Sequence, residues 1–170
     1  MELRSEFLIP AISKTLKDVV LPALTDEQEV AQEQVNLAIG FLDIIAKQQP
    51  LQYAFDADEL KRHQVFADEL CSLLGLEGDH ATIIAEAKKL SDQGTGSPEA
   101  VVATTRQLRE VITEIAANGH ARGDQELSKN VSSKMNDFAR VQLARERAWV
   151  APMGFETGAD KLPSIEEQLK

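Results

Sequence analysis

The sequence is poor in the residues that build disulfide-bonded, β-rich or membrane-spanning proteins. Its 170 residues include one cysteine, Cys71, so no disulfide can form within the chain. Glycine occurs 9 times, proline 6 times, and aromatic residues make up 5% of the chain, whereas β-sandwiches and barrels need many turn residues and many β-branched or aromatic runs. No stretch approaches the ~18 apolar residues of a membrane-spanning helix. These absences disfavour a disulfide-stabilised, a β-rich and a membrane-spanning protein.

The chain also lacks a secretion signal and an excess of positive charge. Its first residues contain no basic segment followed by an apolar run and a cleavage site, so we expect a cytoplasmic protein. There are 18 Lys and Arg against 28 Asp and Glu, which makes the net charge −10. An acidic surface repels phosphate groups. We therefore expect no nucleic acid and no membrane among its partners.

What the sequence does contain is helical periodicity. The pattern Thr25-Asp26-Glu27-Gln28 is typical of a capping box at a helix start, and Ser97 followed by Pro98 is a second start signal. Asn118-Gly119 is expected to end a helix. Apolar residues repeating every three or four positions predict six helices, over residues 6–21, 26–48, 56–74, 81–91, 98–118 and 124–150.

These helices predict an all-α fold, a five- or six-helix, mostly antiparallel bundle with an irregular C-terminal strap. At ~150 residues per domain, residues 1–150 form one helical bundle domain. Residues 151–170 hold two prolines and two glycines together with several apolar side chains. We expect them to be an extended segment packed on the bundle or on a second copy, which would make a homodimer. The predicted core contains Leu16, Phe41, Ile45, Leu70, Leu108, Ile112, Phe138 and Val141.

Glu59, His63 and Gln34 are the candidate site residues. His63 falls in the middle of an apolar helix face, with Glu59 one turn before it, and such a pair can act as acid and base with the carboxylate orienting the imidazole. Alternatively, His63 is a core histidine satisfied by one hydrogen bond. Gln34 interrupts another apolar stripe, where it would satisfy a neighbouring helix end or line a polar pocket. We favour the structural alternatives because no nucleophile can be placed nearby.

Two short motifs suggest ligands only superficially. Glu77-Gly78-Asp79-His80 matches the Glu-x-x-His pattern of dimetal bundles, but that architecture needs two copies and the chain has one. Gly94-Thr95-Gly96-Ser97 lacks the Gly-Lys-Ser/Thr that completes a phosphate loop. Cys71 is expected to face the core, where burial disfavours reactivity. We predict no catalytic residue, no cofactor and no metal ion.

Part of the sequence resembles a known family. Val19-Val20-Leu21-Pro22-Ala23-Leu24, followed by Gln34-Val35-Asn36-Leu37-Ala38-Ile39, is similar to the start of a small uncharacterised bacterial helical family whose genes lie beside acyl-CoA dehydrogenases and aminoglycoside-phosphotransferase-like kinases. The family has arginines in its second helix, where this chain has Gln and Glu. The resemblance implies an accessory role next to acyl-CoA or kinase chemistry and supplies no catalytic residues.

The sequence thus favours a non-catalytic helical interaction or accessory protein, whose partner is another protein. This prediction follows from the absence of a convergent nucleophile, base and anion-stabilising set. The alternative is an enzyme or a small-ligand-binding bundle with a site near Glu59, His63 and Gln34. A pocket that joins these residues to solvent would favour that alternative, and a dry apolar interior around them would exclude it.

Overall fold

The computed structural model describes residues 4–76, 78, 80–94, 96–154, 158 and 161–169. Every regular element in these ranges is helical, which confirms the predicted all-α class. The chain forms two compact units. Unit 1 contains the described residues up to Gln52 and those from Glu146 to Ile165, and unit 2 contains Tyr53–Arg145 and the described residues from Glu166 onward.

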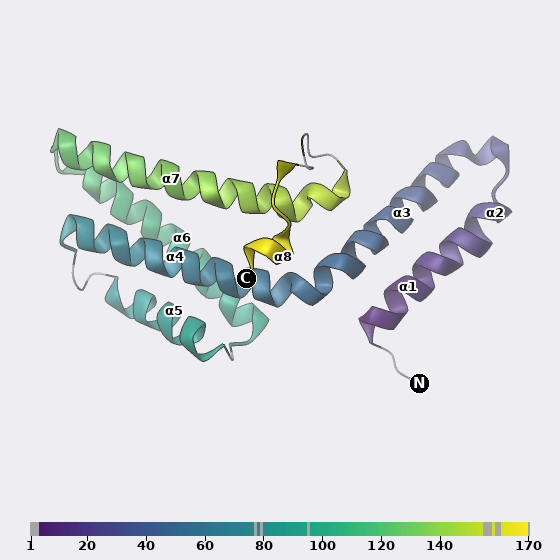
Figure 1. Cartoon of the computed structure of the whole chain (residues 1–170), viewed down its shortest axis with the longest axis horizontal. Coiled ribbons are helices and arrows are strands. Elements are labelled where there is room, and N and C mark those ends of the chain that lie inside the picture. The colour runs from purple at the N-terminus through teal and green to yellow at the C-terminus, as the bar shows by residue number, and fades with distance from the viewer. Residues whose placement is uncertain are drawn as a thin grey trace. The chain divides into compact units, whose positions relative to one another are not determined.

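Unit 1 is built on an antiparallel helical hairpin (Figure 1). Its first arm contains α1, Ser5–Thr15, a π-helical segment, Leu16–Val20, and α2, Leu21–Ala23. Its second arm is α3, Glu29–Gln48. The turn between the arms carries the predicted capping box, in which the Thr25 backbone N–H donates to Gln28 Oε1 at 3.0 Å.

Polar contacts connect the two arms. Ser13 Oγ donates to Asp43 Oδ1 at 3.0 Å, and Lys17 Nζ lies 3.1 Å from Asp43 Oδ2. The hydrogen bonds from Lys17 and then from Ser13 hold the pKa of Asp43 below its ordinary value. Gln49 donates to Ser5 Oγ at the open end of the hairpin. Between residues 4 and 52 only Ser13 and Ile39 are buried, so the hairpin has almost no core of its own.

Two predicted core residues of the hairpin are exposed, and that part of the prediction is wrong. Phe41 and Ile45 expose 50% and 48% of their surfaces, while Leu16 is half-buried. A wide apolar stripe such as that of α3 is fully covered only where several helices surround it. Within the hairpin, α3 has one helical neighbour, so only one side of the stripe is covered.

The C-terminal part of unit 1 begins inside α7, Gln125–Val150. Gln48 Nε2 donates to the Trp149 carbonyl at 2.7 Å, and a 3₁₀ turn, Ala151–Met153, follows. Ile165 is buried at the start of α8, Ile165–Gln168. Residues 155–157, 159, 160 and 170 of the expected strap lie outside the described residues, so its packing stays a prediction.

Unit 2 is a four-helix bundle of α4, Gln52–Leu74, α5, Ala81–Gln93, α6, Pro98–Ala121, and most of α7 (Figure 1). Successive helices run in opposite directions. Tyr53 Oη donates to the carbonyls of Gly94 and Gly96, at 3.2 and 3.0 Å, where α5 ends. Arg122 Nη1 donates to the Leu74 carbonyl at 2.6 Å, where α4 ends.

The bundle has a continuous apolar core. Leu70, Leu108 and Ile112 are buried as predicted, and Phe138 packs half-buried against the core. Val141 was wrongly predicted to be buried, since it exposes 51% of its surface. Leu60, Ile115 and Val131 are fully buried as well, and Cys71 lies among them.

The expected helix end at Asn118-Gly119 is also wrong. α6 continues to Ala121, and the chain leaves the helix near Gly123, whose φ is +74°. A Cβ at Gly119 would lie 3.0 Å from Val131 Cγ2 and 3.2 Å from Leu74 Cδ2. Gly119 is therefore present because α4 and α7 approach α6 closely at this point.

Candidate functional site

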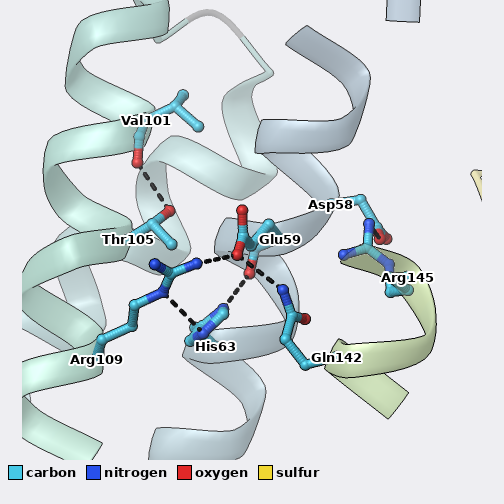
Figure 2. Close-up of polar contacts among 8 residues, drawn as sticks. All are labelled: Asp58, Glu59, His63, Val101, Thr105, Arg109, Gln142 and Arg145. Carbon is cyan, nitrogen blue, oxygen red and sulfur yellow. Dashed lines mark hydrogen bonds and ion pairs between the residues drawn. The ribbon is translucent and has the colours of Figure 1, made fainter. Parts of the chain in front are cut away.

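A polar cluster lies where α4, α6 and α7 meet inside unit 2. Figure 2 shows Glu59 on α4 at its centre, with Arg109 of α6 and Gln142 of α7 pointing toward it. Glu59 Oε1 accepts from Arg109 Nη2 in an ion pair and from Gln142 Nε2 at 2.8 Å. One carboxylate thus ties three helices of the bundle together.

His63 completes the cluster in one defined tautomer. Its Nδ1 lies 2.8 Å from the Glu59 carbonyl oxygen, which can only accept, so Nδ1 carries the proton. Nε2 then accepts from Arg109 Nε at 3.4 Å. The ring is 3% exposed and meets Phe138 edge-on at 5.1 Å between centroids.

The surroundings keep His63 neutral. Burial lowers its pKa from the ordinary 6.5, because the charged imidazolium loses its hydration. The hydrogen bond to the Glu59 carbonyl and the Glu59 charge oppose this shift, and the charges of Arg109 and Arg145 add to it. A neutral ring fits the tautomer that the hydrogen bonds require.

This geometry does not provide a catalytic base. A general base needs a lone pair within reach of a substrate proton, and the Nε2 lone pair of His63 already faces Arg109. The Glu59 carboxylate is 12% exposed and receives donors from two neighbouring helices. Glu59, His63 and Arg109 engage one another's polar groups, as expected for a structural histidine.

Only two of the three predicted site residues belong to this cluster. Gln34 lies exposed on α3 in unit 1. Its place is taken by Arg109 and Gln142, which sequence reasoning missed. The available signal was weak: Gln142 follows Phe138 by one turn on α7, and a single polar residue at the edge of an apolar stripe is usually a solvated side chain.

A second ion pair involves Asp58, the residue directly before Glu59 on α4. Arg145, which interrupts the apolar side of α7, is only 1% exposed, and its Nη2 lies 2.5 Å from Asp58 Oδ2. Arg62 Nε contacts the same oxygen at 2.6 Å. The Arg145 guanidinium also lies 4.6 Å above the Phe55 ring, a cation–π contact. Arg145 is thus a bridge between α7 and α4.

An open groove of about 570 Å³ runs between α4 and α7. Its floor includes Phe66 and Phe138, whose rings stack at 4.1 Å between centroids. Val65 and Val141 line it and are half exposed. Gln142 also lines the groove, so one member of the polar cluster reaches solvent there. His63 and Glu59 are not lining residues, so neither a closed dry interior nor a direct pocket surrounds them.

The part of the chain that the structure describes lacks two kinds of feature. Within the described ranges, no three His, Cys, Asp or Glu residues group closely enough to hold a metal ion; Glu77 and Asp79 lie outside those ranges. Among the same residues, no helix has the length and apolar character needed to cross a membrane. Comparison with models of protein families, with curated proteins and with solved structures finds no match to this chain.

Proposed function

We propose that this chain is a non-catalytic helical interaction protein, acting through an exposed apolar surface of the hairpin in unit 1. The observation that carries the proposal is a set of seven large apolar side chains, each exposing between 39% and 71% of its surface. Soluble proteins rarely leave such contiguous patches uncovered unless they are binding sites. We call this set the apolar hairpin face; it consists of Leu8, Ile12, Val19, Val30, Leu37, Phe41 and Ile45.

Three members of this face, Ile12, Phe41 and Ile45, point away from the groove between the two arms. Lys14 and Asp43 line a polar groove between α1 and α3. Each residue of an α-helix is rotated by about 100° from the last, so a residue two positions away points to the opposite side. Ile12 precedes Lys14 by two, and Phe41 and Ile45 flank Asp43 by two. Ile12, Phe41 and Ile45 therefore point away from the charged residues of this groove.

The polar cluster supports a non-catalytic function. Its hydrogen bonds are made between its own residues, and His63 is held neutral with both ring nitrogens engaged. It joins α4, α6 and α7, as expected for a cluster that stabilises a bundle. Among the eight residues that Figure 2 labels, the one hydroxyl is that of Thr105, and it donates to the Val101 carbonyl.

Affinity purification with matched variants tests the proposal. The hairpin variant is Phe41→Glu, and the control is Leu143→Glu, which places a charge at a similarly exposed position of unit 2 outside the groove between α4 and α7. We expect proteins retained by the wild type to be retained by the control and lost by the hairpin variant. Retention by the hairpin variant would contradict the proposal.

The groove between α4 and α7 favours a second candidate function, binding of a small amphiphilic ligand. The stacked Phe66 and Phe138 rings supply an apolar floor, and Lys134 and Glu69 form an ion pair of 3.1 Å at its edge. Apolar pockets with a few placed polar groups are typical ligand sites.

Dodecanoate, a fatty-acid anion, is a suitable probe of the groove. If the groove binds ligands, dodecanoate shifts the amide resonances of α4 and α7, and Val141→Glu abolishes the shifts. A functional His63 would lose binding in His63→Ala with the fold intact, whereas a structural His63 would mainly lose stability. Unchanged resonances at saturating dodecanoate would contradict this candidate.

A further inference from the structure

We propose that a second copy of this chain covers the apolar hairpin face, in a two-fold symmetric dimer in which α3 crosses the partner's α3 in antiparallel orientation near Gly40. This inference rests on the proposed function, because it names the partner of the same surface. Three features of unit 1 support it: an unexplained glycine, a groove beside a protruding ring, and an uneven distribution of acidic and basic residues along the hairpin.

Gly40 has no explanation among the residues that the structure describes. It lies in the middle of α3, with a φ outside the positive region, so the backbone does not require glycine there. Glycine in a helix interior is unfavourable relative to alanine. A Cβ at Gly40 would meet nothing within 4 Å, whereas a Cβ at Gly119 would meet three side-chain atoms. Space at a buried glycine is filled by its neighbours, so the open space at Gly40 is consistent with a neighbour from another molecule.

The surface around Gly40 is self-complementary. A groove of about 520 Å³ is lined by Gly40, Leu37, Ile44 and Met153, among others, and by Phe41, which is half exposed. A hollow and a protruding ring thus lie side by side on one helix. A two-fold axis through this point places each Phe41 in the hollow of the other copy, because an isologous interface pairs the same patch with itself.

Charge along the hairpin specifies the orientation. The turn half, residues 18–38, holds five acidic side chains and no basic one, namely Asp18, Asp26, Glu27, Glu29 and Glu33. The open half, residues 4–17 and 39–49, holds four basic and two acidic side chains, namely Arg4, Lys14, Lys17, Lys47, Glu6 and Asp43. Lys14, Lys17 and Asp43 line the groove from which Phe41 and Ile45 point away. On α3 itself, Glu33 and Lys47 are each seven residues from Gly40, so antiparallel crossing brings Glu33 of each copy beside Lys47 of the other. Parallel packing would bring the two acidic halves together.

The same charge pattern disfavours other occupants. A uniformly basic helix would be attracted by Glu33 and repelled by Lys47, and a uniformly acidic helix would show the reverse. The surface of an anionic membrane would be repelled by the turn half. A second copy matches both halves at once, because its charges follow the same gradient in the opposite direction.

The hairpin is large enough for a stable dimer. α3 has 20 residues, so the face is about 30 Å long at 1.5 Å per residue. Two helices side by side make it about 20 Å wide. The resulting area of about 600 Å² is comparable to the ~800 Å² that each partner buries in a typical specific interface.

Light scattering after size-exclusion chromatography measures the predicted dimer in the full chain. The wild type should have twice the mass of one chain, and Phe41→Glu should have the mass of one chain. Val141→Glu is the matched control, because Val141 exposes 51% of its surface and Phe41 50%; it should remain dimeric. Added salt should weaken the dimer, since its charge pairs are at the surface. A Phe41→Glu variant that stays dimeric would overturn the inference.

Cysteine cross-linking tests the orientation. Two Cα atoms must lie within about 7 Å to form a disulfide. In the antiparallel dimer, the cysteine of Gly40→Cys lies beside the same cysteine of the second copy. The two should cross-link under mild oxidation. Val30→Cys is ten residues from the crossing point, so its two copies lie about 30 Å apart and should not cross-link. Cys71 is buried and does not compete. Self-cross-linking of Val30→Cys would indicate parallel packing and overturn the proposed geometry.

A monomeric wild type would overturn the dimer, and the dye anilinonaphthalene sulfonate would then show whether the proposed function also fails. If Phe41→Glu lowers the dye fluorescence of the monomer, the hairpin face is open. In that case the proposed function stands, and the proposal that a second copy is the partner is wrong. If the fluorescence is unchanged, the face is covered within one chain, and both the dimer and the docking surface are wrong.

Discussion

The hairpin of unit 1 and the bundle of unit 2 use similar apolar patterns with different results. In the bundle, apolar stripes of four helices meet, and Leu60, Leu70, Leu108 and Ile115 are completely buried. In the hairpin, residues 4–52 bury only Ser13 and Ile39. Two helices offer one mutual contact, whereas four helices enclose a core. An apolar helical stripe therefore predicts that the helix packs against something. The number of neighbouring helices in the same chain decides whether that chain covers the stripe.

The two mid-helix glycines show the same difference on a smaller scale. Gly119 lies in α6 with Val131 and Leu74 packed against its Cα, and Gly40 lies in α3 with nothing within 4 Å of a Cβ position. The first glycine is explained by the bundle. The second is explained by the proposed dimer, in which another α3 passes over it.

The largest expected effect separates the two units through core truncation. Leu108→Ala should lower the free energy of unfolding by about 2–5 kcal/mol, because it removes buried apolar atoms and leaves a cavity. Ile45→Ala should change the free energy of unfolding of the isolated chain by less than about 0.5 kcal/mol, since Ile45 is half exposed. Urea denaturation at low protein concentration measures both. If both variants lose the same unfolding free energy, and the loss does not depend on protein concentration, then the hairpin face is buried in its own chain.

The second prediction concerns the ion pair of Arg145 with Asp58. Asp58→Ala removes the Asp58 carboxylate from the Arg145 guanidinium, which is 1% exposed, and should cost about 3 kcal/mol of unfolding free energy. Arg145→Met should cost less than half as much, because methionine fills the apolar part of the site and Asp58 keeps Arg62. Urea denaturation of both variants tests this asymmetry. If Arg145→Met lowers the unfolding free energy more than Asp58→Ala does, the ion pair stabilises the bundle mainly by the attraction between its charges.

The third prediction compares the glycines directly in a Phe41→Glu background, where the proposed dimer is absent. Gly40→Ala should stabilise α3 by about 0.5–1 kcal/mol, because alanine is the better helix residue. Gly119→Ala should destabilise the bundle by about 1 kcal/mol, because Val131 and Leu74 must move. Hydrogen exchange reports the two units separately. Stabilisation by Gly119→Ala would contradict the close packing at that position.

The smallest expected effect is a pH dependence from His63. Its folded pKa is lowered from 6.5, mainly by burial, so below about pH 6.5 the unfolded chain binds more protons than the folded chain. Stability therefore falls as pH decreases through that range and is fully retained above it. Thermal melts of the wild type and of His63→Gln should diverge in slope below this pH. Parallel slopes would mean that His63 does not couple protonation to folding.

Local signals identified most of the helices correctly. The capping box at Thr25 and the Ser97-Pro98 start are present in the structure, where Ser97 Oγ accepts from the Ala100 N–H at 3.2 Å. These signals depend on neighbours within four residues and can be read from the chain. Asn118-Gly119 misled the prediction because a glycine at a close helix crossing has the same local appearance as a glycine that ends a helix.

The candidate site was predictable only in part. His63 was placed correctly on a buried face of its helix, and Glu59 one turn before it, since both share one periodicity. Arg109 and Gln142 are 50 and 83 residues from Glu59 in the chain, so no local pattern links them. Their roles depend on how three helices pack, and charge or polarity at one position does not encode that.

The sequence by itself determined the helical class, the burial of Leu70, Leu108 and Ile112, and the apolar character of α3, because these follow from residue type and from a period of about 3.6 residues per turn. Tertiary structure decided which stripes are covered. It buried Arg145 beside Asp58, and it left Phe41 and Ile45 at the surface. The physical reason is that burial is a property of the number and placement of neighbours, whereas a helical stripe records only that a neighbour is needed.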